Sequence, residues 1–133
     1  MLKVEHIGIA VQSLQKSIPL FETLLNTSCY KQEQVDSEAV RTAFFQKGET
    51  KVELLEPINP ESVIARFLEK KGEGMHHIAF DVADIHAEMA RLASAGFTLL
   101  NPEPKKGADN KLVCFLHPKD TSGVLVELCQ EII

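Results

Sequence analysis

The sequence has little that would indicate a disulfide scaffold, a nucleic-acid-binding surface or a membrane span. Its three cysteines are odd in number, lack C-x-x-C spacing and sit beside apolar residues, as free buried thiols in a reducing compartment usually do. Lys and Arg (14) are outnumbered by Asp and Glu (19), and the net charge of -5 argues against a nucleic-acid partner. No apolar run approaches a bilayer span, and the first residues are strand-like rather than a charged leader. We therefore expect a cytoplasmic protein without membrane or nucleic-acid partners.

An internal repeat divides the chain into two similar halves. Glu5–Val11 (EHIGIAV) is similar to His76–Val82 (HHIAFDV), and Val52–Leu55 (VELL) is similar to Val126–Cys129 (VELC). Such a repeat indicates a duplicated supersecondary unit, which cannot bury its hydrophobic face alone. With 44% hydrophobic residues, the chain can bury the core of one ordinary domain spanning residues 1–133.

Each half reads as a strand, a helix and further strands. Apolar residues at helical spacing predict a helix from Ser13 to Leu25, with Ser13 as N-cap. A second helix is predicted to begin after Asp84, its N-cap, and to end at Gly96. Pro19 predicts a kink or a lost first turn in the earlier helix. The later strands are expected at residues 40–46, 51–55, 98–100, 113–116 and 124–129.

These elements predict an α+β fold of two tandem βαβββ modules. The first module covers about residues 1–59, a linking helix about 60–73, and the second module about 74–133. Because each module has one apolar sheet face to bury, we expect the two to form a curved mixed sheet around a metal-containing cleft.

Two histidines and two glutamates recur at equivalent places in the halves. His6 alternates with Ile7 and so lies on the face opposite the most obvious core residues, and His77 does the same in the second half. Glu53 and Glu127 also alternate with apolar neighbours. Two imidazoles and two carboxylates that converge on one cleft would suit a divalent ion such as Zn²⁺, Ni²⁺, Co²⁺ or Mn²⁺. A single His or Glu on a strand is more often structural or solvated, but the recurrence of both types favours a metal site.

Three further histidines are weaker candidates. His76 could be a ligand by residue type, but the alignment of the two halves selects its neighbour, and His76 then points to the other face. His86 is expected to be exposed on a helix. His117 lies in the loop before the strand of Glu127 and could line the rim of the cleft.

Longer motifs around these residues resemble a known family. They are HIGIAV from His6, ELLEP from Glu53, FLEKKGEGMHHI from Phe67, FLHPK from Phe115 and GVLVEL from Gly123. Over nearly the whole chain they resemble the methylmalonyl-CoA epimerases of the vicinal oxygen chelate (glyoxalase/bleomycin resistance/dioxygenase) superfamily. The resemblance implies a homodimeric isomerase that interconverts (R)- and (S)-methylmalonyl-CoA.

The resemblance also implies roles for particular residues. His6, Glu53, His77 and Glu127 are implied as metal ligands, with Co²⁺ as the expected ion, and Glu53 stands where some relatives carry Gln. Some epimerases have a second catalytic Glu at the position of Thr42, so that base cannot be carried over to this chain.

Epimerisation requires two bases that flank the carbon between thioester and carboxylate, and a cation that neutralises the developing enolate. We expect Glu127 to be one base. The other could be Glu53, if it loosens from the metal, or a residue that the sequence does not fix, such as Glu38, which we expect on the same strand face as Thr42. An acyl-CoA substrate is polyanionic, and the cations that could meet it are Lys105, Lys106, Lys111 and Lys119.

Other activities of the same superfamily remain alternatives. A glyoxalase I-type lactoylglutathione lyase would use similar ligands. A ring-cleaving dioxygenase would need iron and only three protein ligands, so a fourth at Glu53 counts against it. A non-enzymatic binding protein would have lost the ligands that this chain retains.

Overall fold

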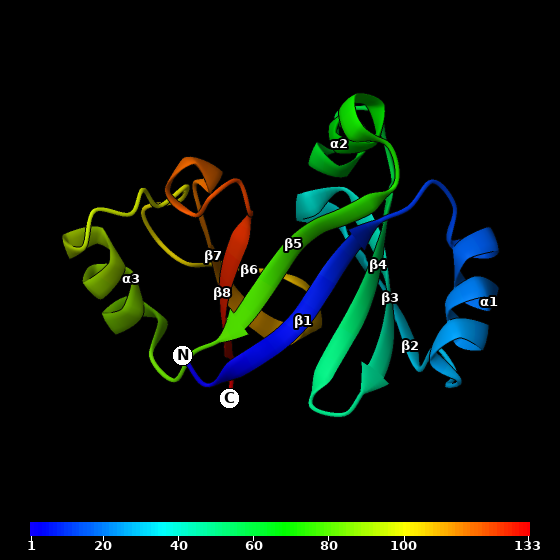
Figure 1. The fold of residues 1–133 in the computed structure, drawn as a ribbon, viewed down its shortest axis with the longest axis horizontal. Helices are drawn as coiled ribbons and strands as arrows, with labels where there is room; N and C mark the ends of the chain where they lie inside the picture. The colour runs from blue at the N-terminus through cyan, green and yellow to red at the C-terminus, as the bar shows by residue number, and fades with distance from the viewer. The chain divides into compact units, whose positions relative to one another are not determined.

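A βαβββ pattern occurs twice along the chain, as the repeat predicts (Figure 1). The computed structural model describes residues 1–133 and contains three α-helices and eight strands. The chain divides into two compact units, which we call the N-terminal unit (His6–His76) and the C-terminal unit (Met1–Glu5 with His77–Ile133). The predicted α+β class is confirmed.

The N-terminal unit contains a four-stranded mixed sheet with the strand order β2-β3-β4-β1. Its first and last strands, β1 and β4, pair in parallel, whereas β3 pairs antiparallel with both of its neighbours. The elements are β1 (Lys3–Ala10), α1 (Leu14–Leu25), β2 (Lys31–Val35), β3 (Val40–Lys47), β4 (Thr50–Pro57) and α2 (Val63–Lys71).

The C-terminal unit repeats this topology with the strand order β5-β8-β7-β6. Again the first and last strands, β5 and β8, are parallel, and the other pairs are antiparallel. The elements are β5 (Gly74–Asp81), α3 (Ile85–Ser94), β6 (Lys105–Lys106), β7 (Lys111–Leu116) and β8 (Val126–Glu131). The equivalent strand orders show that the sequence repeat is a structural repeat.

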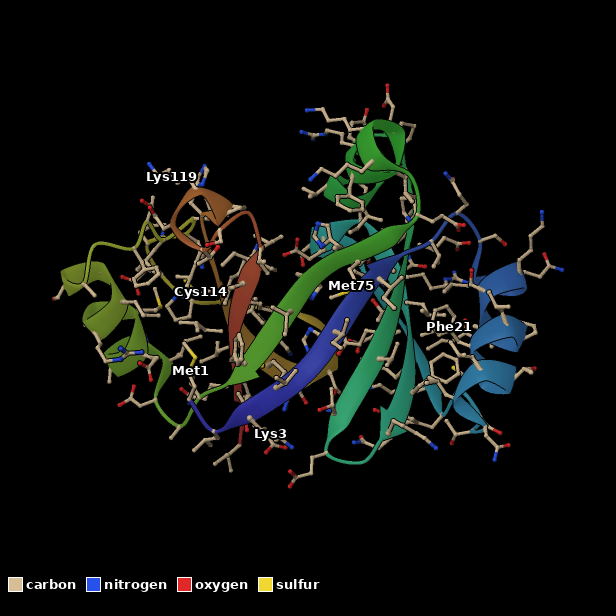
Figure 2. The ribbon with its side chains drawn as sticks, viewed as in Figure 1. Met1, Lys3, Phe21, Met75, Cys114 and Lys119 are labelled. Atoms are coloured by element: carbon tan, nitrogen blue, oxygen red, sulfur yellow. The ribbon has the colours of Figure 1, made fainter.

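Each sheet packs one face against the helix that follows its first strand. In the N-terminal unit, Phe45 and Leu54 are fully buried in a cluster with Leu14 of α1, and Figure 2 shows Phe21 between that helix and the sheet. In the C-terminal unit, Cys114 lies in the equivalent cluster with the apolar residues of α3. The other face of each sheet carries the polar residues of the predicted site, and in the N-terminal unit part of that face also packs against α2.

The predicted helix N-caps are confirmed. The Ser13 hydroxyl accepts a hydrogen bond from the backbone N–H of Lys16, and the Asp84 carboxylate accepts one from Ala87. Helix α1 continues through Pro19. Proline has no N–H to donate to the carbonyl of Gln15, but both residues are exposed, so water can bond to that carbonyl instead. None of the helices has the length and apolar character that a membrane crossing requires.

Two strand predictions need correction. Residues 98–100 form only an isolated bridge, Leu99 with Leu116, and the fourth strand of that sheet is instead β6 at Lys105–Lys106. The strand β2 was missed because its sequence, Lys-Gln-Glu-Gln-Val, carries no apolar alternation. It is an edge strand, where polar side chains are tolerated on both faces.

Candidate metal and acid-base site

The N-terminal unit holds the first His–Glu pair. His6 lies on β1 and Glu53 on β4, and the parallel register places Glu53 beside Gly8, one pleat beyond His6 on the same face. The distance between His6 Nδ1 and Glu53 Oε2 is 3.2 Å. Both side chains are buried, with exposed fractions of 6% and 5%. Because Gly8 has no side chain, it leaves room on this face beside both polar groups.

The C-terminal unit holds an equivalent pair. His77 lies on β5 and Glu127 on β8, where Glu127 is beside Ala79 in the parallel register. His77 Nε2 and Glu127 Oε1 are 3.3 Å apart, and the exposed fractions of the two side chains are 6% and 7%. The ring of Phe115 packs edge-on against the His77 imidazole at 5.8 Å between centroids, which fixes the orientation of that ring.

The two pairs occupy the same place in the repeated topology. In each unit the Glu is opposite a Phe on the antiparallel neighbour: Phe44 opposite Glu53, and Phe115 opposite Glu127. A buried carboxylate is costly unless it is paired or coordinates a cation. Each pair supplies an imidazole nitrogen and carboxylate oxygens, which are good ligands for a divalent first-row metal ion. The donor chemistry therefore fits the metal that the sequence analysis predicts.

The remaining histidines do not belong to these pairs. His76 packs edge-on against Phe67 of α2 at 5.0 Å, and burial lowers its pKa to about 4, so it is neutral at physiological pH. Its predicted structural role is consistent with this packing. His86 is exposed on α3 as expected. His117 accepts a hydrogen bond from the backbone N–H of Lys119 at 3.0 Å and so caps a short 3-10 turn.

Glu38 lies outside the strand on which we predicted it. It ends a 3-10 turn, Asp36–Glu38, and Ala39 follows in the left-handed conformation with φ of 53°. This turn separates Glu38 from β3, which begins at Val40, so strand alternation does not place Glu38 on the face of Thr42. Thr42 itself is fully buried on β3.

The predicted lysine cluster contains one residue with a different role. Lys111 is buried, and its ammonium group lies 3.8 Å from the Glu5 carboxylate in the C-terminal unit. A buried cation that already faces a carboxylate is a poor candidate for binding CoA phosphates. Lys105, Lys106 and Lys119 are exposed, and Figure 2 shows Lys119 extending from the turn before β8.

The cysteines are free thiols, as predicted. Cys114 and Cys129 are buried and Cys29 is half-buried. Burial, together with the carboxylates of Glu127 and Glu5, raises the pKa of Cys129 far above its usual range, so its thiol stays protonated. Sequence reasoning missed the buried Glu5–Lys111 pair, because nothing in the local pattern of either strand marks a lysine for burial.

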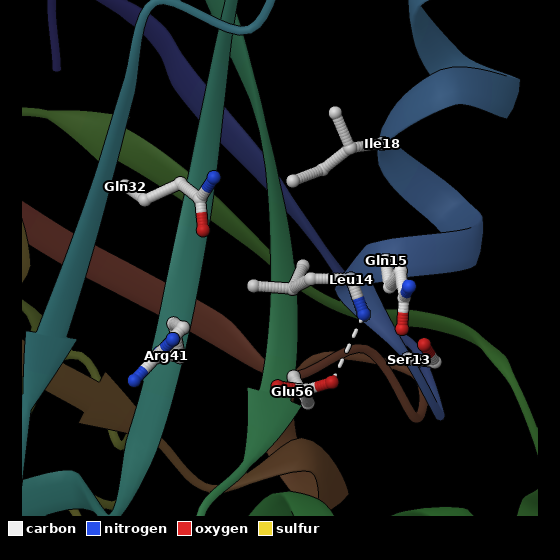
Figure 3. A pocket seen from close by; sticks show the side chains of 7 residues that line it. All are labelled: Ser13, Leu14, Gln15, Ile18, Gln32, Arg41 and Glu56. Atoms are coloured by element: carbon white, nitrogen blue, oxygen red, sulfur yellow. Dashed lines mark hydrogen bonds between the residues drawn. The ribbon is translucent and has the colours of Figure 1, made fainter.

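A separate pocket opens on the opposite face of the N-terminal sheet (Figure 3). It lies between α1 and strands β2, β3 and β4, and Glu56 at its edge accepts a hydrogen bond from the backbone N–H of Leu14 at 3.0 Å. Arg41 and Gln32 line its other side. Because Glu56 and Arg41 alternate with Leu55 and Thr42 along their strands, this pocket does not contain the His6–Glu53 pair.

Comparison with known proteins places the chain in a family. The sequence profile described as the Glyoxalase/Bleomycin resistance protein/Dioxygenase superfamily matches residues 5–115. The chain belongs to this superfamily. Membership accounts for the duplicated βαβββ topology, and it confirms the family resemblance stated from the motifs.

Within the superfamily, the chain is similar to named epimerases. It is 41% identical to the ethylmalonyl-CoA/methylmalonyl-CoA epimerase of Cereibacter sphaeroides, over 96% of this chain and 97% of that protein. It is 40% identical to human mitochondrial methylmalonyl-CoA epimerase, over 96% of this chain and 73% of that protein. A structure of Streptomyces coelicolor methylmalonyl-CoA epimerase, a variant in complex with 2-nitronate-propionyl-CoA, matches with a TM-score of 0.93 at 32% identity, covering 100% and 99% of the two chains. The predicted resemblance to an isomerase family is confirmed.

Proposed function

We propose that this protein interconverts (R)- and (S)-methylmalonyl-CoA. The observation that carries the proposal is the recurrence of a buried His–Glu pair at the same place in both units. The epimerases named above support the acyl-CoA substrate. The ligand of the Streptomyces enzyme adds to this support, because a nitronate is a planar carbon centre with delocalised negative charge, like a substrate that has lost its α-proton.

The metal centre is part of the same proposal. His6, Glu53, His77 and Glu127 would serve as the ligands of a divalent ion, with Co²⁺ expected and Zn²⁺, Ni²⁺ or Mn²⁺ also suited to these donors. When bound, such an ion acts as a Lewis acid that stabilises negative charge on the oxygens of the substrate.

The protein's own residues supply the proton transfer. Glu127 takes the proton from one side of the carbon between the thioester and the carboxylate, and a second acid on the opposite side of that carbon returns a proton to it. Its buried position suits this task, because few water molecules compete for the carboxylate. Phe115 holds the His77 ring, and so keeps the nitrogen of His77 beside Glu127 in a fixed orientation.

The substrate's CoA group requires a cationic surface. With Lys111 paired to Glu5, the exposed lysines on this unit that could meet the CoA phosphates are Lys105, Lys106 and Lys119. A homodimer and a cytoplasmic location complete the proposal, and size-exclusion chromatography with light scattering tests the former.

Deuterium wash-in at the α-carbon of methylmalonyl-CoA tests the activity. Metal-loaded protein in D₂O should exchange that proton and convert either epimer into a mixture, and a chelator should stop both processes. The same preparation should be offered the hemithioacetal of methylglyoxal and glutathione. Formation of lactoylglutathione without α-carbon exchange would overturn the proposal in favour of glyoxalase I chemistry.

A further inference from the structure

The hydroxyl of Thr42 is a buried polar group without a hydrogen-bond partner in the protein. The residue is 0% exposed, and Oγ1 makes no hydrogen bond. A buried hydroxyl left in this state destabilises the folded protein, so its presence requires a reason other than stability.

Packing alone does not explain a threonine at this position. Thr42 is opposite Leu55, two residues beyond Glu53 on β4. In the C-terminal unit, Val113 is opposite Cys129, two residues beyond Glu127 on β8. Val113 therefore occupies the equivalent place with a side chain of nearly the same shape and no hydroxyl.

The hydroxyl lies on the face of the sheet that carries the His6–Glu53 pair. Because Phe44 is opposite Glu53, Thr42 is a diagonal neighbour of Glu53, a relation with roughly 7–8 Å between Cα atoms. The other residues around it are apolar: Val40 and Leu55 belong to a cluster packed against α2. Thr42 thus provides a neutral hydrogen-bond donor at the apolar border of the polar pair.

We propose that the Thr42 hydroxyl donates a hydrogen bond to the free carboxylate of the bound acyl-CoA. This inference rests on the proposed function, which supplies a substrate with two acceptor groups, a thioester carbonyl and a carboxylate. The carboxylate is fully charged before the reaction begins, and hydrogen bonds to charged acceptors are the stronger ones. A site built around such a bond discriminates against analogues that lack the acceptor, so Thr42 is a specificity-determining residue.

The test compares Thr42→Val, which keeps the shape, with Thr42→Ser, which keeps the hydroxyl. Thr42→Val should raise the KM for methylmalonyl-CoA about 10- to 100-fold, whereas Thr42→Ser should stay near wild type. Binding of propionyl-CoA, which has the thioester but no carboxylate, should be unchanged in both variants. The substrate-free Thr42→Val protein should melt at a higher temperature than wild type, because an unpaired buried hydroxyl has been removed.

Val113→Thr provides the matched control for stability and should lower the melting temperature. An unchanged KM in Thr42→Val, or an equal loss of propionyl-CoA binding, would overturn the inference while leaving the epimerase activity intact. A lower melting temperature of Thr42→Val would also overturn it, because the hydroxyl would then serve the fold. Wild-type protein that exchanges no α-proton would overturn the proposed function and this inference together.

Discussion

The change Glu127→Gln should remove most of the turnover, whereas Glu53→Gln should preserve most of it. The two carboxylates have nearly the same surroundings: 3.2 Å and 3.3 Å to their histidines, and exposed side-chain fractions of 5% and 7%. The Gln amide oxygen can still accept a hydrogen bond from the histidine, but bonds to charged groups contribute about 1.5–3 kcal/mol against about 0.5–1.5 kcal/mol for neutral ones, and this structural cost should be similar in the two variants. A difference in activity between them therefore reports on proton transfer rather than on packing.

The expected difference can be given a magnitude. General base catalysis by a positioned side chain contributes about 10²- to 10⁴-fold, and the Glu127→Gln variant should lose all of it because an amide is not a base at neutral pH. In the Glu53→Gln variant the amide oxygen can still act as a metal ligand, so turnover should fall less than about 10-fold.

Both variants should be assayed for deuterium wash-in after loading with Co²⁺ to the same occupancy, as determined by elemental analysis. Thermal unfolding of the two metal-free proteins checks that the structural costs match. Equal losses of turnover at equal occupancy would contradict this prediction, because Glu53 would then contribute as much to proton transfer as Glu127 and would be the second base.

Three further predictions concern the metal, the backbone and the substrate. Co²⁺ at about 100 times its Kd should raise the free energy of unfolding by about 2.7 kcal/mol, and His77→Ala should remove most of that gain in calorimetry. Ala39→Gly should raise the free energy of unfolding by about 0.5–1 kcal/mol in urea titrations, because Ala39 has a left-handed φ of 53°; a decrease would contradict this. The double change Lys105→Gln and Lys106→Gln should raise the KM for methylmalonyl-CoA at low salt with little change in kcat, and the effect should shrink at high salt, since exposed charges are screened. A KM ratio independent of salt would exclude these lysines from phosphate binding.

The sequence was most informative where a physical pattern repeats. The helix caps at Ser13 and Asp84 were predictable because only a side chain at the N-cap position, just before the first helical residue, can accept hydrogen bonds from the first helical N–H groups. The candidate ligands stood out because the same residue types recur in the same alternation on β1 and β5.

Features that depend on tertiary surroundings could not be predicted. Lys111 is buried because Glu5, far away in the sequence, supplies its partner. Strand β2 is held by pairing with β3 rather than by its own apolar pattern. The misplacement of Glu38 has a similar origin, because the left-handed turn at Ala39 is adopted by a residue type that gives no sign of it.

The parallel pairing of the first and last strands of each unit determines how the His–Glu pairs can be disrupted. In each unit the His stands on the opening strand and the Glu on the closing one, with a helix and two other strands between them in the chain. The donor atoms of a pair therefore come together only when the whole intervening unit has folded, at the entropic cost of a long loop closure. A substitution that unfolds any element of a unit, however far from the donor atoms, should separate the His from the Glu. The affinity for the metal should therefore report whether each unit is folded.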